Sequence, residues 1–419
     1  MSERRRVVIT GYGAVTPLGA DAETFWEALV AGRSGVRAIT TFDASRVTSR
    51  IAGEVPDFDP SIVLDRKEIR RNDRTTQMAL VATRAAMAMA GLPDRLHEAE
   101  ALQTAVIIGS GLGGTGTLID QISVNATRGP DRLSPFFIPM AIGNMAAGQV
   151  AISFNAKGPN FSTTSACASA GHAIGEAAEM ILRGDAEAAW AGGAEATVYE
   201  ATLGGFAAMR ALSTRNDDPA GASRPFDSGR DGFVLAEGAG MVVLEELGHA
   251  RARGVPILAE LCGYAASADA SHITAPAPGG EGALRAARRA LQKAGMGADA
   301  IDVVSAHATS TPAGDMEELA AIRSLLGDRA ARVPVTATKS AIGHTLGAAG
   351  AIAMVAMLMA MRDGKVPPTL NLTDPDPAVG DMDLTPLVAR DHEVGVALIN
   401  AFGFGGQNSA IVIRRWDEA

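Results

Sequence analysis

A single cysteine, Cys167, stands among small residues in the segment STTSACASAG at 162–171. Residues 172–183 form an amphipathic, Ala- and Met-rich stretch that stops at Gly184, which predicts a helix just after the cysteine. Unpaired backbone N–H groups and the positive end of a helix dipole favour a thiolate over a thiol at such a place. These residues suggest a nucleophile; a buried structural cysteine is the alternative.

Two histidines have surroundings that suit chemistry. His307 follows a predicted apolar strand, within SAHATSTP at 305–312, and His344 precedes a Gly- and Ala-rich helix, within KSAIGHTLG at 339–347. Small and hydroxyl-bearing neighbours allow backbone and hydroxyl groups to approach a ligand. A lone histidine is usually structural, but this pair together with Cys167 predicts a catalytic group.

Two glycine-rich segments have different interpretations. The segment FGFGG at 402–406 follows a predicted strand and could present backbone N–H groups to an oxyanion, or simply form a hairpin. The segment GLGG at 111–114 lacks the G-x-G-x-x-G spacing and the acidic residue of a dinucleotide site, so nucleotide binding is not predicted. No His or Cys cluster has metal-ligand spacing, so no metal site is predicted.

Short β-branched runs alternate with Ala-rich helical stretches, which predicts an α/β protein with layered sheets and helices. The predicted strands are 7–10, 105–108, 186–191, 240–244, 257–262, 301–304, 333–336 and 394–399. The clearest other predicted helices are 22–31, 75–90, 282–294 and 314–326.

The chain also shows a faint internal duplication. Three pairs of segments match in the same order: 9–12 with 261–264, 105–108 with 302–305, and 171–183 with 350–362. We therefore expect two similar halves, 1–255 and 256–419, with no flexible linker between them. If the halves pack face to face, Cys167 and the turn at His344 meet at their interface.

Composition narrows the class of protein. With 419 residues, 47% hydrophobic and 20% charged, the chain can bury a large core, and its net charge of −10 argues against nucleic acid as the main partner. Two cysteines and no secretory signal point to a reducing cytoplasm. The apolar stretch 346–361 falls short of the roughly 20 residues of a membrane span and predicts a core helix instead. The polar stretch 213–230 is expected to be a surface excursion.

Four ordered segments, around Cys167, His307, His344 and the 403–406 loop, resemble the β-ketoacyl-acyl-carrier-protein synthases, most closely the elongating synthase II type. The resemblance covers nearly the whole chain. It implies a thiolase-like fold, a duplicated α-β-α-β-α sandwich whose two similar halves each carry a mixed five-stranded sheet. It also implies a homodimer.

The resemblance further implies a role for each matching residue. Cys167 would hold the acyl chain as a thioester, with the N–H groups of Cys167 and Phe404 stabilising the oxyanion. His307 and His344 would donate Nε–H to the enolate formed when malonyl-carrier protein loses CO2, and Lys339 would order the His344 side. The implied substrate contacts are Thr309 and Thr311 for pantetheine, Leu112 and Phe137 for the acyl chain, and Gly403 and Gly405 in the loop where Phe404 gates the pocket. No metal or redox cofactor is implied, because the substrates travel on the phosphopantetheine of acyl carrier protein.

A locally basic segment, 65–74, stands out in an acidic protein. Such a run is usually a solvated helix face. In the related synthases the matching region docks the acidic carrier protein, which implicates Lys67, Arg70, Arg71 and Arg210.

The chain departs from the family at Ala308, where glycine is usual, and at Ser305, where asparagine is common. The extra methyl group of Ala308 could restrict the backbone or narrow the pantetheine tunnel.

Several related classes fit less well. A degradative thiolase needs a second cysteine in the C-terminal glycine loop, initiating and plant-type polyketide synthases use Cys-His-Asn, and a chain-length factor lacks the cysteine. A discrete polyketide or specialised-lipid ketosynthase remains open because it would use the same Cys-His-His chemistry. A carrier-binding subunit that has lost condensation is a further alternative. It would be revealed by acylation of the protein without elongation of the acyl chain.

Overall fold

The structure is a computed structural model and describes residues 5–417. Its main feature is one ten-stranded sheet with the order β10-β9-β13-β14-β8-β1-β7-β6-β4-β5. The N-terminal strands are β1 Val7–Val15, β4 Thr104–Gly109, β5 Asn160–Thr163, β6 Ala188–Glu195 and β7 Gly238–Glu246. The C-terminal strands are β8 Ala259–Ala268, β9 Val303–Ser305, β10 Val335–Thr336, β13 Val396–Gly403 and β14 Gln407–Arg415.

The strand pairing repeats between the two halves. In β1-β7-β6-β4-β5 and in β8-β14-β13-β9-β10, the first two pairings are antiparallel and the last two are parallel. The halves join where Val7 of β1 pairs with Leu261 of β8. The predicted duplicated α/β architecture is therefore confirmed by the pairing.

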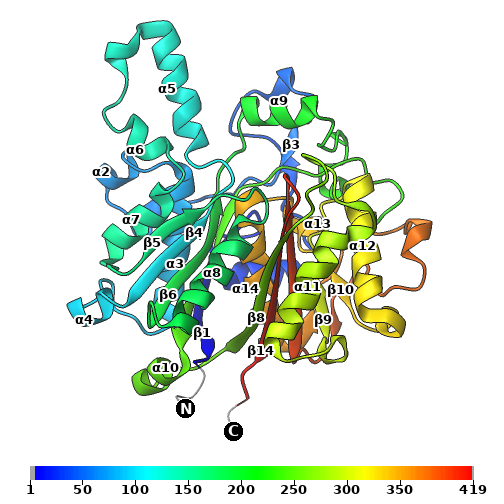
Figure 1. Cartoon of the computed structure of the whole chain (residues 1–419). Coiled ribbons are helices and arrows are strands. Elements are labelled where there is room, and N and C mark those ends of the chain that lie inside the picture. Colours follow the sequence, from blue (N-terminus) through cyan, green and yellow to red (C-terminus); the bar gives the residue numbers. More distant parts are fainter. Residues whose placement is uncertain (1–4, 418–419) are drawn as a thin grey trace.

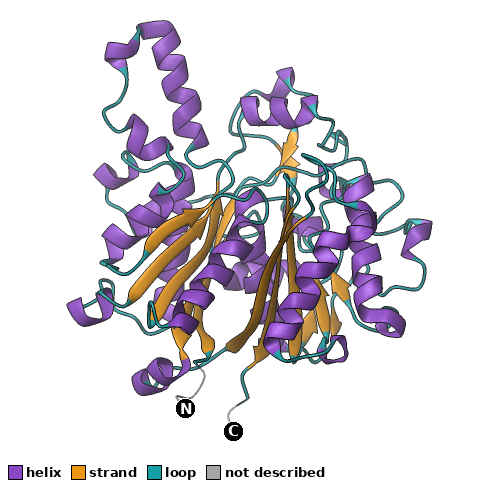
Figure 2. Cartoon of the chain, viewed as in Figure 1, coloured by secondary structure: helices purple, strands orange, loops and turns teal. Residues whose placement is uncertain are grey.

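Helices cover both outer faces and fill the space between the half-sheets (Figures 1 and 2). The N-terminal half-sheet packs outside against α3 Arg74–Met89 and α7 Met145–Phe154, and the C-terminal one against α11 Glu281–Ala294 and α12 Pro312–Leu326. Between them lie α8 Ser169–Arg183 and α14 Ala349–Asp363. The remaining helices include α1 Ala22–Val30, α2 Arg66–Ile69, α4 Glu98–Ala101, α5 Thr115–Arg128, α6 Phe137–Ala141, α9 Glu200–Ala208, α10 Leu247–Arg253 and α13 Lys339–Ile342.

The two central helices are the matching segments of the duplication, and each is 15 residues long. Their first turns touch, because a Cβ placed on Gly350 would lie only 3.1 Å from the backbone nitrogen of Gly171. By length and composition Leu346–Asp363 could cross a membrane, but 89% of this segment is buried inside the protein. It is the core helix that its Ala- and Met-rich sequence predicts.

Two expectations need correction. Strands β1 and β8 continue well past their predicted ends at 10 and 262. Their Ala- and Gly-rich second halves are held by pairing with β7 and β14 rather than by β propensity. The 213–230 stretch is also not purely a surface excursion. Phe226 is fully buried, and the buried Asp227 carboxylate accepts N–H bonds from Thr373 and Asp374, so this stretch anchors the 373–374 turn.

Candidate active site

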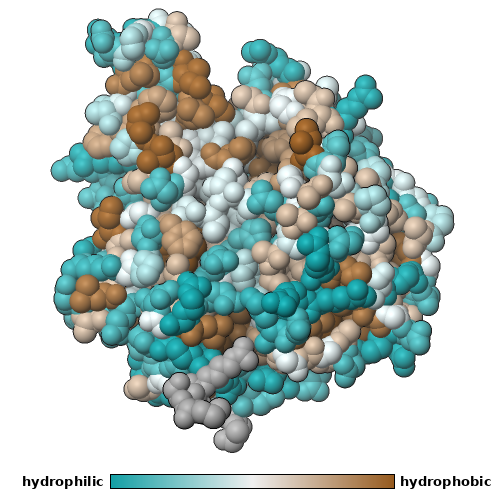
Figure 3. Space-filling view, viewed as in Figure 1, coloured by the Kyte–Doolittle hydropathy of each residue, from teal (hydrophilic) through white to brown (hydrophobic). Residues whose placement is uncertain are grey.

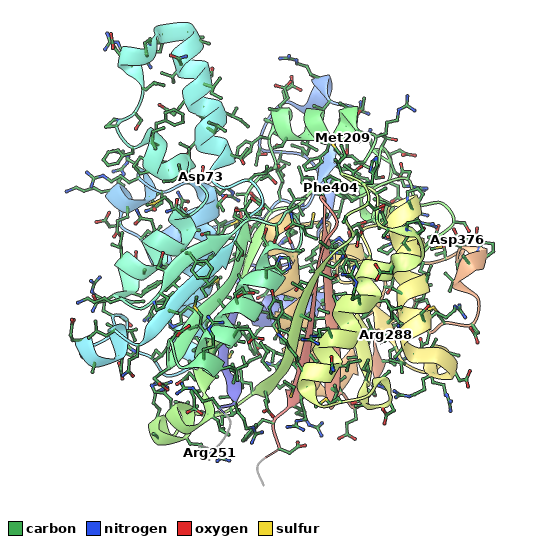
Figure 4. The ribbon with its side chains drawn as sticks, in the orientation of Figure 1. Asp73, Met209, Arg251, Arg288, Asp376 and Phe404 are labelled. Atoms are coloured by element: carbon green, nitrogen blue, oxygen red, sulfur yellow. The ribbon has the colours of Figure 1, made fainter. Side chains whose placement is uncertain are left out.

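A cavity of about 550 Å³ opens between the two halves. The predicted site residues that line it are Leu112, Cys167, Arg210, His307, Thr309, Thr311, His344, Gly403 and Phe404. Met209 also lines the cavity, and Figure 4 shows it in the same upper region of the molecule as Phe404. Lys339 is buried next to the site, whereas Phe137, Gly405, Lys67, Arg70 and Arg71 lie outside this lining.

Cys167 sits in a tight turn between β5 and α8. Ala166, just before it, has a left-handed backbone with φ of 50°. The hydroxyl of Ser169 holds the turn: it donates to the Ala166 carbonyl at 2.6 Å and accepts from the Ser165 N–H at 2.9 Å. Strained backbone of this kind persists only where neighbours fix it, so the cysteine is rigidly placed.

The glycine-rich loop packs directly on this turn. A Cβ on Gly403 would lie 2.6 Å from the Ser165 carbonyl oxygen, so only glycine fits there. The N–H groups of Cys167 and Phe404 both point toward the Cys167 sulfur and lower the pKa of its thiol. The two N–H groups thus lie beside the atom that would bear an acyl group, where they could donate to the oxygen of that group as an oxyanion hole does.

His172, which the sequence analysis did not single out, ties the same parts together. Its Nδ1 lies 2.6 Å from the Ser165 hydroxyl, and its Nε2 lies 3.2 Å from the Asn408 carbonyl oxygen. The ring therefore links the cysteine turn of one half to strand β14 of the other.

The expected preference for a thiolate is wrong for the resting protein. Burial raises the pKa of Cys167 to about 12, and Glu195 adds to the rise. Lys339 and the two backbone N–H groups lower this pKa, but one helix end and one ammonium do not offset full desolvation. Cys167 is therefore a protonated thiol in the resting protein.

His307 and His344 meet edge to face, with ring centroids 5.4 Å apart and planes at 86°. Burial, and then the Lys339 charge, lower both histidine pKa values well below 6.5, so both rings are neutral at physiological pH. The Leu346 N–H donates to His344 Nδ1 at 3.3 Å, which assigns the ring hydrogen to Nε2. His307 Nδ1 has no hydrogen-bond partner within residues 5–417.

Two buried acids that the sequence analysis missed support the His307 loop from α12. Glu318 accepts the N–H groups of His307 and Ala308, both at 2.7 Å, and Asp315 accepts that of Ser310 at 3.0 Å. Burial raises the pKa of Asp315 to about 7 and also raises that of Glu318. The available signal was their spacing of three residues on one helix face just after Pro312.

Ala308 adopts the left-handed conformation that its usual glycine would favour, with φ of 37°. It packs in the C-terminal core and does not line the cavity, so its methyl group restricts the backbone rather than the tunnel.

We expect Ala308→Gly to be nearly neutral for stability. Relief of left-handed strain, about 1–2 kcal/mol, offsets the loss of a buried methyl group and the added chain entropy, together about 1.5 kcal/mol. The control Ala306→Gly, at a buried position without positive φ, gains no such relief and should lower the free energy of unfolding by about 1.5 kcal/mol. Denaturant titration of both variants tests this, and equal losses would contradict it.

Lys339 should shape the pH dependence of acylation. Burial lowers its pKa to about 8, although Glu318 opposes this. Below that pH the ammonium lowers the Cys167 pKa, and above it that support is lost. The acylation rate should therefore rise with pH and flatten above about pH 8, whereas Lys339→Met should be slower near neutral pH and show no bend there. Single-turnover acylation rates of both proteins across this pH range test the prediction. An identical bend in both profiles would refute the role of Lys339 in the pH dependence.

Comparisons with known proteins show the family to which the chain belongs. The profile of the β-ketoacyl synthase N-terminal domain matches residues 4–250, and that of its C-terminal domain matches residues 258–373. The chain belongs to the β-ketoacyl synthase family and has its thiolase-like fold. Among individual relatives, 3-oxoacyl-[acyl-carrier-protein] synthase 2 of Coxiella burnetii is 48% identical and that of Staphylococcus aureus strain COL is 45% identical. The first match covers 99% of this chain and of its relative, and the second covers 100% of each.

Solved structures show the same fold. A β-ketoacyl synthase from Burkholderia phymatum STM815 superposes with a TM-score of 0.92 at 36% identity. A chain from a complex described as a type II PKS acyl-carrier protein with its ketosynthase bound to the hexaketide gives 0.90 at 32% identity. Each match covers 99% of this chain and 100% of the other.

Proposed function

We propose that this protein catalyses the decarboxylative Claisen condensation of malonyl-acyl carrier protein with a Cys167-bound acyl chain in fatty-acid biosynthesis. The product is a β-ketoacyl-acyl carrier protein two carbons longer. The observation that supports this reaction best is a single cavity holding a cysteine, two N–H groups aimed at its sulfur, and two neutral histidines.

In the first half-reaction the Cys167 sulfur attacks the acyl thioester. The carrier-protein thiolate leaves with the proton that Cys167 gives up. The N–H groups of Cys167 and Phe404 stabilise the tetrahedral oxyanion, each by roughly 3 kcal/mol.

In the second half-reaction malonyl-carrier protein loses CO2. The C–C bonding electrons pass into an enolate, whose oxygen accepts Nε2–H bonds from His344 and His307. The enolate carbon attacks the acyl carbonyl, the C–S bond breaks, and Cys167 leaves as a thiolate that takes up one proton from water. Lys339 supports this step by keeping both rings neutral. The phosphopantetheine thioesters carry the substrates, so the proposal needs no metal or redox cofactor.

The cavity offers sites for each part of the substrate. Thr309 and Thr311, whose hydroxyls lie 3.1 Å apart, would bind the pantetheine arm. Phe404 would gate the entrance, with Gly403 and Gly405 allowing the loop to move. Leu112 would line the acyl end, joined by Phe137 from the arm that α5 and α6 form.

That arm supports a homodimer. It projects from the body (Figure 1), and apolar patches cover part of its surface below a hydrophilic tip (Figure 3). Its exposed side chains include Leu118, Ile122, Ile138 and Ile142, and Phe161 is exposed on β5 at the end of the sheet. An open sheet edge beside an apolar patch is suited to a second copy. In each protomer the half 1–255 would supply the nucleophile and dimer contacts, and the half 256–419 would supply the histidines and the loop.

Acyl carrier protein would dock at the cavity mouth. Arg210 is exposed on the lining, and Lys67, Arg70 and Arg71 are exposed near α2. These positive side chains suit an acidic partner. We also infer that the protein acts in the cytoplasm, since both of its cysteines are free.

A discrete polyketide or specialised-lipid ketosynthase is the second candidate. The similarity to a chain of the hexaketide-bound complex favours it. The higher identity to proteins named 3-oxoacyl-[acyl-carrier-protein] synthase 2, 45–48% over essentially the whole chain, favours fatty-acid synthesis.

Intact-mass measurement tests the function. The protein is incubated with acyl-carrier proteins of increasing chain length, and malonyl-carrier protein is then added. We expect a mass gain on Cys167 that is discharged as a product two carbons longer. No acylation across the series would overturn the fatty-acid proposal, and acylation without discharge would overturn the condensation.

A further inference from the structure

Glu195 is a buried carboxylate that the proposed mechanism does not use. It ends β6, is 0% exposed, and accepts four hydrogen bonds. Oε1 accepts from the Ser110 hydroxyl at 3.0 Å and the Leu112 N–H at 3.2 Å. Oε2 accepts from the Gly111 N–H at 2.6 Å and the Gly347 N–H at 3.0 Å. One side chain thus bridges a loop of each half.

The bridge is tight. A Cβ placed on Gly347 would lie 2.5 Å from the Gly111 nitrogen and 2.6 Å from Glu195 Oε2. The two loops therefore touch with the carboxylate between them, and neither can shift without the other. Gly111 and Leu112 line the cavity on one side, and Leu346 lines it on the other.

The second loop carries the group that fixes His344. Leu346 has a left-handed backbone with φ of 45°, which a branched side chain disfavours. Its N–H donates to His344 Nδ1, and the next N–H, that of Gly347, donates to Glu195. The carboxylate therefore holds the strained turn that sets the His344 tautomer.

We propose that Glu195 is a positioning residue that locks the Leu112 loop to the His344 turn, so that acyl-chain selection and malonyl decarboxylation both depend on this one carboxylate. The proposal rests on the condensing function proposed above. Burial raises the pKa of Glu195 to about 7, and its four hydrogen-bond donors oppose this rise.

The two carboxylate oxygens allow the two effects to be separated. In Glu195→Gln we expect the amide NH2 to take the place of Oε1, because at Oε2 it would face the N–H donors of Gly111 and Gly347. At Oε1 it faces the Ser110 hydroxyl, which can turn to accept a hydrogen bond. The Leu112 N–H then loses its acceptor while Gly347 keeps its own. Glu195→Ala releases both loops.

The test measures KM and kcat for acyl-carrier proteins of several chain lengths, and malonyl-carrier protein decarboxylation separately. Glu195→Gln should change the long-to-short ratio of kcat/KM by about tenfold and leave decarboxylation near the wild-type rate. Glu195→Ala should also slow decarboxylation by about tenfold or more. If Glu195→Ala does not fold, Ser110→Ala is a milder substitute. It should shift the chain-length ratio in the same direction as Glu195→Gln.

The matched control is Glu54→Gln. Glu54 is also buried and accepts bonds from the N–H and hydroxyl groups of Thr40 and Thr41, but it lies outside the cavity. Glu195 variants that alter chain-length ratio and decarboxylation no more than Glu54→Gln does would overturn the positioning role. A wild-type protein that elongates no chain would instead overturn the proposed function.

Discussion

Replacing Cys167 with alanine is expected to abolish chain elongation while malonyl-acyl carrier protein is still decarboxylated. The sulfur is the atom on which the Cys167 and Phe404 N–H groups converge, so no other group can hold the acyl chain there. Loss of a nucleophile that acts in concert with its neighbours lowers the rate by about 10⁴-fold or more. The histidines and Lys339 remain, so the enolate can still form. Product analysis and CO2 release, measured on the same sample, give both results.

The control is Cys262→Ala. Cys262 lies on β8 and packs toward the outer C-terminal core, away from the cavity. It should retain wild-type elongation and acyl-enzyme mass. An elongating Cys167→Ala protein would show that the nucleophile lies elsewhere.

The opposite dissociation is expected for His344→Ala: Cys167 is still acylated, but the acyl chain is not extended. The Leu346 N–H fixes the His344 tautomer and leaves the ring hydrogen on Nε2, which in the proposed mechanism donates to the enolate oxygen. Removal of one such preorganised donor typically costs about 10²–10³-fold. Because the lost interaction belongs to the second half-reaction, the acyl-enzyme should accumulate in intact-mass spectra and persist after malonyl-carrier protein is added.

His392→Ala is the control for this variant. The His392 ring lies near the Asp302 carbonyl, at 3.0 Å, outside the cavity lining. Its elongation rate should stay close to that of the wild type. A His344→Ala protein that fails to acylate would instead assign His344 to the first half-reaction.

Much of the architecture could be predicted because apolar periodicity fixes which segments become strands and buried helices. The matching segments at 171–183 and 350–362 were sufficient to expect that Cys167 and His344 would face each other, and they do line one cavity. Local propensity was least informative where tertiary pairing decides the outcome. The Ala- and Gly-rich end of β8 is a strand only because β14 lies beside it.

The electrostatics of the site were harder to predict. A helix N-terminus before Ser169 is visible in the sequence, but the depth of burial that raises the Cys167 pKa is a property of the assembled layers. Glu195 and Glu318 were missed for a related reason. Their partners are mainly backbone N–H groups of loops, one of them 84 residues from Glu195 and another 11 residues from Glu318. Bonds to backbone groups leave little trace in the types of the surrounding side chains.

The contact between Gly171 and Gly350 brings the positive ends of two long helix dipoles together at one point. The two positive helix ends repel each other, and the strands packed on either side hold the helices in place. Negative charge that develops nearby, first on the tetrahedral oxygen and later on the enolate, meets dipoles that are already oriented, so little reorientation is needed during the reaction. The fold therefore orients these dipoles in advance, and the reaction avoids the free-energy cost of orienting water around the developing charge in each catalytic cycle.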